Sequence, residues 1–184
     1  PFVLYFLFVT GMRFGELMAL TPDELDFENN RIYTYRRYNT LLKKFVPPKN
    51  KTSIRYVPLK EGDMALLREL VSLQERVNKE LGLNNSDRLV FQHFSYKYGV
   101  PLTDTVNKYL REMLEDLEIE PLITTKGARH TYGSYLWHCG IDLGVIAKVL
   151  GHKDITMLIE VYGHTLEEKV DAEFDRIRSL KYKK

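Results

Sequence analysis

The stretch LGHKDITMLIEVYGH, Leu150 to His164, decides how the fold is interpreted, because it links the end of a helix to a tyrosine. Asp142 is placed to cap an apolar helical segment, and Gly151 is a natural end for it. His152 follows that glycine directly, and Tyr162 lies ten residues further on. From this stretch alone, Tyr162 is either one core aromatic in a chain with 12 tyrosines or a positioned nucleophile.

Upstream of this stretch, the pattern of apolar residues is mostly helical. The clearest amphipathic segment follows Asp104, which is placed to cap it. We expect this helix to bury the apolar residues that repeat at helical spacing, namely Val106, Tyr109, Leu110, Met113, Leu114 and Leu117. Further helices are expected from about Phe2 to Thr10, through MRFGELMAL, from about Leu66 to Gly82, from Thr124 to about Cys139, and after Thr165.

Strand-like segments are confined to the first third of the chain. RIYTYRRY (Arg31–Tyr38) is rich in β-branched and aromatic residues, and KKFV and IRYVPL follow as two further strand candidates. A turn-rich segment, residues 47–53, joins the last two. The sequence therefore predicts one mainly α domain over residues 1–184, with a small three-stranded antiparallel β-sheet that carries many basic residues.

The overall composition limits the class of protein only loosely. The formal net charge is +2, so bulk charge neither requires nor excludes nucleic acid, and any basic patch must be local. The single cysteine, Cys139, excludes an internal disulfide and suits a reducing compartment. The opening PFVLYFLFV is too short to span a bilayer, and we interpret it as a buried helix whose start is missing.

Several kinds of site are disfavoured by the absence of their motifs. The five histidines show no His-x-x-x-His pairing, and no cluster of carboxylates accompanies them. No Gly-x-Ser-x-Gly nucleophile motif and no phosphate-binding Gly-Lys-Ser/Thr loop occurs. The sequence therefore disfavours metal-dependent hydrolysis, serine hydrolysis and nucleotide binding. We predict no metal and no cofactor.

What remains is a set of basic residues at breaks between segments: Arg13, Lys51, Lys126, Arg129 and His152. Each alone is more often a solvated surface charge. A planar guanidinium group binds two phosphate oxygens at once, and two such groups together stabilise a pentacoordinate phosphorus transition state. Lysine and histidine supply protons or hydrogen bonds. Spacing alone does not show that these side chains meet in space.

Four segments occur in a fixed order: TGMRFGEL (10–17), KNKTSIRYVPL (49–59), KGARHTYGSYL (126–136) and LGHKDITMLIEVYGH (150–164). The set resembles the catalytic domain of the tyrosine recombinases, the phage integrase family, over nearly the whole chain. The resemblance implies a helical catalytic domain with a three-stranded sheet. It also implies that the chain is a C-terminal fragment that lacks an N-terminal core-DNA-binding domain.

The resemblance assigns roles residue by residue. Arg13 matches the first catalytic arginine, and Glu16 the acidic residue that supports it. Lys51 matches the catalytic lysine in a turn between two strands, with Lys49 as the competing choice. Arg129 matches the second catalytic arginine.

The other matches lie near that second arginine and in the C-terminal stretch. His152 matches the catalytic histidine, Tyr162 the nucleophile, and His130 a supporting residue. The family usually has histidine three residues before the second arginine, where this chain has Lys126. An ammonium group only donates hydrogen bonds, so it cannot accept the proton of the tyrosine. The hypothesis is that Lys126 binds the scissile phosphate while His152 carries more of the proton transfer.

The implied function is site-specific DNA recombination through a 3′-phosphotyrosine, for integration or excision of a phage or mobile element. Alternatives with related chemistry are Xer-type dimer resolution of chromosomes or plasmids and a type IB topoisomerase-like activity. From other classes, the alternatives are a non-catalytic DNA-binding module and a helical protein-interaction domain. The complete set of matched residues argues against both, because binding alone does not require a nucleophile.

The resemblance also implies partners. These are double-stranded recombination sites, further copies of the chain in a tetramer on DNA, and an accessory DNA-bending or directionality protein, with no membrane. A nucleoid-associated, cytoplasmic location in a bacterial host follows. Contacts to the DNA backbone are expected from Lys43, Lys44, Lys49 and Arg55. The apolar stripe Val170, Phe174, Ile177 and Leu180 packs either on a neighbouring protomer or on its own domain, and the sequence does not choose between them.

Overall fold

The computed structural model describes residues 2–92, 99–156, 158–160, 170, 174 and 177–180. The predicted nucleophile, Tyr162, lies outside these residues. The helices are α1 (Phe2–Thr10), α2 (Phe14–Leu17), α3 (Glu61–Leu81), α4 (Thr103–Asp116), α5 (Thr125–His138) and α6 (Leu143–Leu150). Two single 3-10 turns are η1 (Pro22–Glu24) and η2 (Lys51–Ser53). The strands are β1 (Leu25–Asp26), β2 (Arg31–Thr34), β3 (Arg37–Asn39), β4 (Lys44–Val46) and β5 (Arg55–Pro58).

The strands form a three-stranded antiparallel sheet in the order β1-β2-β5, and β3 and β4 form a separate two-stranded ladder. The fold class is therefore the predicted one, but the membership of the sheet differs. RIYTYRRY is two strands, and KKFV pairs with the second of them instead of joining the main sheet. The strand is interrupted at Arg36, which forms an ion pair at 3.0 Å with the buried carboxylate of Glu24. That contact links residues 12 apart, so strand propensity alone does not reveal it.

The helix ends follow the local signals in the sequence. Asp142 accepts hydrogen bonds from the main-chain N–H groups of Gly144 and Val145, which confirms it as the cap of α6. Gly82 and Gly151 end α3 and α6 in the left-handed conformation, as predicted. None of the described helices combines the length and the hydropathy needed to cross a bilayer.

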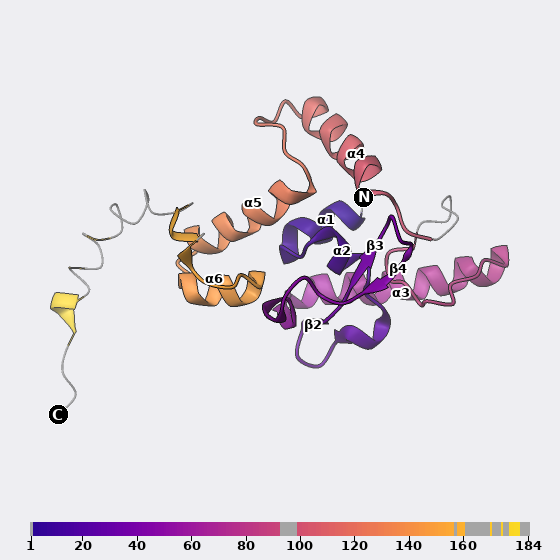
Figure 1. Cartoon of the computed structure of the whole chain (residues 1–184), viewed down its shortest axis with the longest axis horizontal. Helices are drawn as coiled ribbons and strands as arrows, with labels where there is room; N and C mark the ends of the chain where they lie inside the picture. Colours follow the sequence, from indigo (N-terminus) through magenta and orange to yellow (C-terminus); the bar gives the residue numbers. More distant parts are fainter. Residues whose placement is uncertain are drawn as a thin grey trace.

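Two apolar clusters hold the domain together. The larger one lies between α1, α3 and the main sheet and includes Phe6, Leu17, Ile32, Val57 and Leu67. The smaller one lies where α5 and α6 meet and includes Tyr132, Ile146, Leu150 and Leu158. Helix α5 packs against both α1 and α6, and α6 also packs against β5 (Figure 1). The ends of α1, β5 and α6 are thereby brought to one place.

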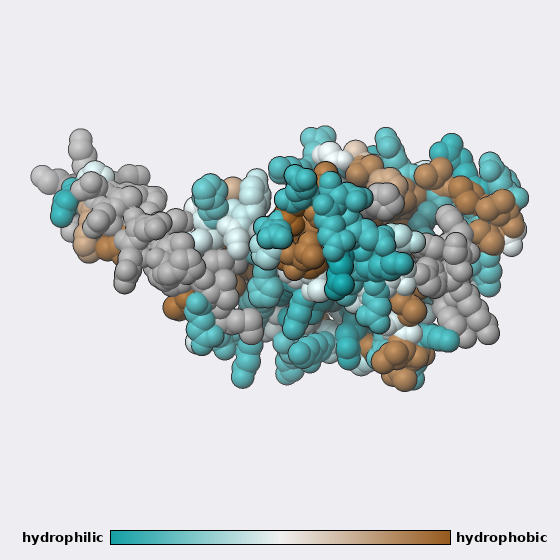
Figure 2. Space-filling view, turned by 90° about the horizontal axis from the view of Figure 1, so that it is seen from above, coloured by the Kyte–Doolittle hydropathy of each residue, from teal (hydrophilic) through white to brown (hydrophobic). Residues whose placement is uncertain are grey.

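Helix α4 is more exposed than its pattern predicts. It begins at Thr103 with Leu102 as its cap, so Asp104 lies in the first turn. Val106, Leu110 and Leu114 are buried, which confirms half of the predicted face. The other three apolar residues are 40–60% exposed: Tyr109, Met113 and Leu117. Figure 2, which views the molecule from the side of α4, shows apolar side chains between hydrophilic ones at the surface.

Candidate active site

A buried carboxylate organises two arginines. Glu16, in α2, is only 3% exposed. Its Oε1 accepts a hydrogen bond from Arg13 Nη1 at 2.7 Å, and its Oε2 accepts one from Arg55 Nη2 at 2.9 Å. Burial opposes ionisation of Glu16, but the charges and hydrogen bonds of Arg55 and Arg13 outweigh it and lower the pKa of the carboxyl group. The predicted supporting role of Glu16 toward Arg13 is thus matched by a direct contact.

A third arginine lies beside this pair. Arg129, in α5, is 8% exposed, and its Nη1 donates to the main-chain carbonyl of Gly11 at 2.7 Å. Its Nη2 donates to the carbonyl of Leu150, the last residue of α6. Burial, Arg13 and Arg55 lower the pKa of Arg129 to about 9. The group therefore stays a cation at neutral pH.

Gly151 connects the end of α6 to the arginines. Its carbonyl oxygen accepts a hydrogen bond from Arg13 Nη2 at 3.2 Å. The residue has φ +69°, and a Cβ atom there would lie 2.7 Å from the carbonyl oxygen of Thr52. Both the backbone conformation and the close approach therefore require glycine.

His152 follows this glycine and is partly buried. Among the described residues, no hydrogen-bond partner reaches its buried Nδ1. Burial, and then the charges of Arg129, Arg13, His130 and Arg55 in that order, lower the pKa of His152 to about 4. The imidazole is therefore neutral at physiological pH, and the surrounding positive charges oppose its protonation.

The charge of this cluster defines what it binds. Two guanidinium groups bind Glu16 and a third, that of Arg129, lies near them, so three positive charges and one negative charge leave a local charge of +2 before any lysine is counted. Arg13 makes the cluster accessible from solvent, because the Arg13 side chain is 31% exposed. A cationic site of forked donors with a neutral imidazole at its rim suits the oxygens of a phosphodiester.

The predicted lysine lies on a turn that is fixed to the same cluster. Lys51 begins η2, which Asn50 caps by accepting hydrogen bonds from the N–H of Ser53 at 3.0 Å and from its hydroxyl at 2.7 Å. Arg13 Nη1 in turn donates to Ser53 Oγ at 3.2 Å. The side chains of Lys51 and Lys49 are both exposed, so the structure leaves both as candidates.

Lys126 and His130 have exposed side chains on α5, on either side of Arg129 in sequence. The Lys126 main-chain N–H donates to the side chain of Thr124, which caps the helix. The charge of His130 contributes to the lowered pKa of His152, so the supporting histidine lies near the predicted catalytic one.

The predicted DNA-contacting residues divide into two groups. Lys43, Lys44 and Lys49 have exposed side chains, in the turn before β4, at its first residue and after its end, respectively. Arg55 instead points into the interior, is 8% exposed, and has a protein acceptor for Nε, Nη1 and Nη2 alike. Arg55 therefore lacks the surface position that a contact with the DNA backbone requires, and the expectation that it is exposed is wrong. Its alternation with buried Val57 along β5 was the signal for this orientation.

Another tyrosine close to Arg129 in sequence, Tyr132, is unsuited to nucleophilic attack. Its ring is buried against Gly11, where a Cβ atom would lie 2.5 Å from the ring. Burial, then the charge of Asp63 and the neighbouring Tyr135, raise the pKa of Tyr132. A raised pKa disfavours the phenolate.

Sequence reasoning missed the residues that fix the η2 turn. Asn50 and Ser53 are three apart, the spacing of a side-chain cap with the N–H it binds, and this pattern was available in the sequence. The main-chain acceptors at Gly11, Leu150 and Gly151 carry no such signal, because every residue has a carbonyl group.

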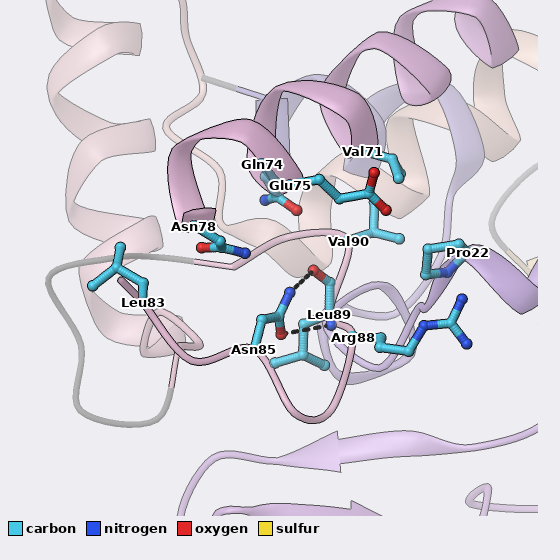
Figure 3. Close-up of a pocket in the computed structure, with 10 residues that line it drawn as sticks. All are labelled: Pro22, Val71, Gln74, Glu75, Asn78, Leu83, Asn85, Arg88, Leu89 and Val90. Atoms are coloured by element: carbon cyan, nitrogen blue, oxygen red, sulfur yellow. Dashed lines mark hydrogen bonds between the residues drawn. The ribbon is translucent and has the colours of Figure 1, made fainter. Parts of the chain in front are cut away.

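The described residues hold no group of three or more His, Cys, Asp or Glu side chains that would bind a metal ion. A separate polar cavity of about 280 Å³ lies between η1, α3 and residues 83–90 (Figure 3). None of the predicted site residues lines it. The arginine cluster is thus the feature that the predicted residues share.

The fold and the cluster define a class of protein: a mostly helical domain with a phosphodiester-type anion site at the meeting point of its helix ends. The sequence profile of the phage integrase family matches residues 2–169, and the chain belongs to this family. The family predicted from the four motifs is thereby confirmed.

Two curated relatives agree with this assignment, and a solved structure shares the fold. The chain is 31% identical over 176 residues to the ICEBs1 integrase of Bacillus subtilis (strain 168), covering 94% of this chain and 47% of the relative. It is 30% identical over 174 residues to the integrase of Staphylococcus phage L54a, covering 91% and 48%. The Tn1549 transposon integrase in complex with transposon right end DNA has a similar fold, with TM-score 0.74, 22% identity, and coverage of 97% and 58%. The chain spans about half the length of these curated relatives.

Proposed function

We propose that this chain is the catalytic part of a site-specific DNA recombinase that breaks and rejoins strands through a 3′-phosphotyrosine. The observation that carries the proposal is the convergence of Arg13, Arg129 and His152. Arg13 and Arg129 bind the carbonyls of Gly151 and Leu150, the two residues directly before His152. The similarity to integrases of a phage and of ICEBs1 supports a role in integration or excision of a mobile element.

The proposed reaction is a phosphoryl transfer in two steps. The Tyr162 oxygen attacks the scissile phosphorus, and its proton passes to neutral His152. The bond from phosphorus to the 5′-oxygen breaks, and Lys51 gives that oxygen a proton. A 5′-hydroxyl of the partner strand then attacks the phosphotyrosine and gives its proton to Lys51, the bond from phosphorus to the tyrosine oxygen breaks, and His152 returns a proton to Tyr162, so the new strands are joined. The phosphotyrosine retains the energy of the broken bond, so no ATP is required.

The arginines act by charge and geometry. In the transition state, negative charge accumulates on the non-bridging oxygens of the phosphate. Arg13 and Arg129 are held by protein acceptors before DNA arrives, so they need little reorganisation. The bound phosphate would also offset the positive charges that keep His152 neutral, which favours protonation of His152 as Tyr162 attacks.

Lys126 is assigned to binding of the scissile phosphate, because its ammonium group only donates. Lys126→His tests this assignment through the rate of cleavage. A large loss of rate shows that the lysine has a role that imidazole does not fill. An unchanged rate removes the assignment.

The covalent intermediate is the direct test of the proposed function. Nicked suicide DNA, which releases the cleaved strand and so prevents religation, is incubated with the protein and with Tyr162→Phe. We expect a covalent adduct with the wild type that disappears in the variant. An adduct that persists in Tyr162→Phe removes Tyr162 as the nucleophile. Relaxation of supercoiled plasmid with no joining of two duplexes indicates the type IB topoisomerase-like alternative.

The proposed partners are double-stranded recombination sites and further copies of the chain. Exposed Lys43, Lys44 and Lys49 support contacts to the DNA backbone. The apolar side chains near the C-terminus are 41–65% exposed, which supports packing on a neighbouring protomer over packing in cis: Val170, Phe174, Ile177 and Leu180. Deleting residues 166–184 should abolish synaptic complexes on DNA, and unchanged assembly would rule out an essential contact between protomers.

A further inference from the structure

Arg55 is the one member of the arginine cluster that the proposed reaction leaves without a task. Its side chain is 6% exposed and faces Glu16, whose side chain is 3% exposed. Its Nε, Nη1 and Nη2 all donate to protein acceptors, so it has no uncommitted nitrogen to offer a phosphate, whereas the Arg13 side chain is 31% exposed. A buried guanidinium requires partners for its donors, and the identity of those partners indicates its role.

The three partners of Arg55 lie on three different segments of the site. Nη2 donates to Glu16 in α2 at 2.9 Å, beside Arg13. Nη1 donates to the carbonyl of Ser53 at 3.1 Å, the last residue of the η2 turn that begins with Lys51. Nε donates to the carbonyl of Val149 in α6 at 2.6 Å, three residues before His152.

The η2 turn and the end of α6 also touch each other directly. The Thr52 hydroxyl lies between two acceptors, Asn50 Oδ1 at 3.0 Å and the Gly151 carbonyl at 3.3 Å. A Cβ atom on Gly151 would lie 3.0 Å from Arg55 Nη1 and 3.1 Å from Arg55 Cδ. The guanidinium therefore fills the space between the turn and the helix end and fixes their separation.

We propose that Arg55 is a positioning residue that sets the lysine of the η2 turn against His152 and Arg13, and so aligns the proton donor with the leaving 5′-oxygen. The inference rests on the proposed function. Lysine cannot replace Arg55 in this role, because a single ammonium nitrogen does not reproduce three donors in a planar fork. A misplacement of about 1 Å in a reacting group costs on the order of 10²-fold in rate.

The test separates the leaving-group proton from every other step. In one substrate the scissile phosphate has its normal 5′-oxygen, and in the other sulfur replaces that bridging atom. When the tyrosine oxygen bonds to phosphorus, the phosphorus–sulfur bond breaks and the sulfur leaves as a thiolate, which needs no proton donor because thiols are far more acidic than alcohols. A defect in the position of the proton donor therefore affects only the oxygen substrate.

We expect Arg55→Lys to slow cleavage of the oxygen substrate at least about tenfold and of the sulfur substrate less than about threefold. Binding of both DNAs should stay within about threefold, because Arg55 does not touch phosphate. The matched control is Arg31→Lys, in the adjoining strand β2, where Arg31 forms a more exposed ion pair with Asp26 at 2.7 Å. This control should cleave both substrates at the wild-type rate.

Two results overturn the inference: an equal loss on both substrates, which places Arg55 in support of Arg13 or of folding alone, and no loss on either. If Arg55→Lys does not fold, Thr52→Val carries the same comparison, because it removes a hydroxyl between the turn and Gly151 from a partly exposed position. Failure of the proposed function gives a different result, since the wild type then forms no adduct with either substrate.

Discussion

The arginines and the lysines of the site are held in opposite ways. Arg55 and Arg129 are each 8% exposed and bind carbonyls or a carboxylate of the protein, and Arg13 is fixed by Glu16, Ser53 and Gly151. Lys51 and Lys126 have exposed side chains on well-anchored backbone. The arginine charges are thus held in place by protein acceptors, whereas the two lysine side chains are placed only through their backbone.

The largest effect is expected at Arg129. Arg129→Lys loses the simultaneous contacts with Gly11 and Leu150 and leaves a buried ammonium with fewer acceptors. We expect covalent-adduct formation to fall by about 10³-fold, because preorganised donors lose their effect when their position is lost. Single-turnover cleavage of suicide DNA measures it. A loss below tenfold would mean that the charge alone, and not the fork, is required.

The two candidate lysines should separate clearly. Lys51→Ala should slow cleavage on the order of 10²-fold through loss of a proton donor. Lys49→Ala should stay within about threefold on the same substrate, because Lys49 precedes the capped η2 turn. The reverse order would transfer the role to Lys49 and show that the anchored turn does not mark the acid.

Gly151 tests how closely the turn and the helix end are packed. Gly151→Ala combines an unfavourable φ of +69° with a 2.7 Å approach to the Thr52 carbonyl. We expect the free energy of unfolding to fall by about 2 kcal/mol or more, measured by denaturant titration. Gly82→Ala is the control, since it has φ +61° with nothing within 4 Å, and should lose only about 1 kcal/mol. Equal losses would show that the contact with Thr52 is soft.

The last prediction concerns the pH dependence of stability at His152. The unfolded residue binds a proton near its ordinary pKa of 6.5, whereas the folded residue stays neutral down to about 4. Acidification through this window therefore favours the unfolded state, so stability is lost as pH falls from 6.5 toward 4. His152→Gln should flatten that part of the stability curve relative to His138→Gln, at the exposed end of α5. Parallel curves for the two variants would contradict the lowered pKa.

Local signals made the helices predictable. The ends of α3 and α6 could be predicted because Gly82, Asp142 and Gly151 act on the residues next to them. The membership of the sheet could not, because local strand propensity does not record contacts such as the ion pair of Arg36 with Glu24. The exposed half of α4 could not be predicted for a similar reason. An apolar stripe on a helix does not indicate how many of its residues pack against the rest of the protein.

The site was predictable to the extent that motifs record it. The four motifs identified Arg13, Glu16, Arg129 and His152, which the structure brings together. Arg55 was expected at the surface, because an arginine in a basic segment is a common DNA contact. Its alternation with Val57 along β5 indicates the buried face instead. The carboxylate that receives it is 39 residues away, beyond any local pattern. The role of Tyr162 stays a prediction from the sequence.

The use of main-chain carbonyls to hold the arginines has a consequence for divergence. A carbonyl keeps its position whichever side chain the residue carries, so substitutions at Val149 or Leu150 that preserve the helix leave its acceptors in place. Side chains around the site are thus free to change while the carbonyl acceptors keep their places. A fold retained at TM-score 0.74 with 22% identity is consistent with this freedom. Surface side chains can therefore be substituted, by evolution or by design, while the main-chain acceptors keep the arginines in their arrangement.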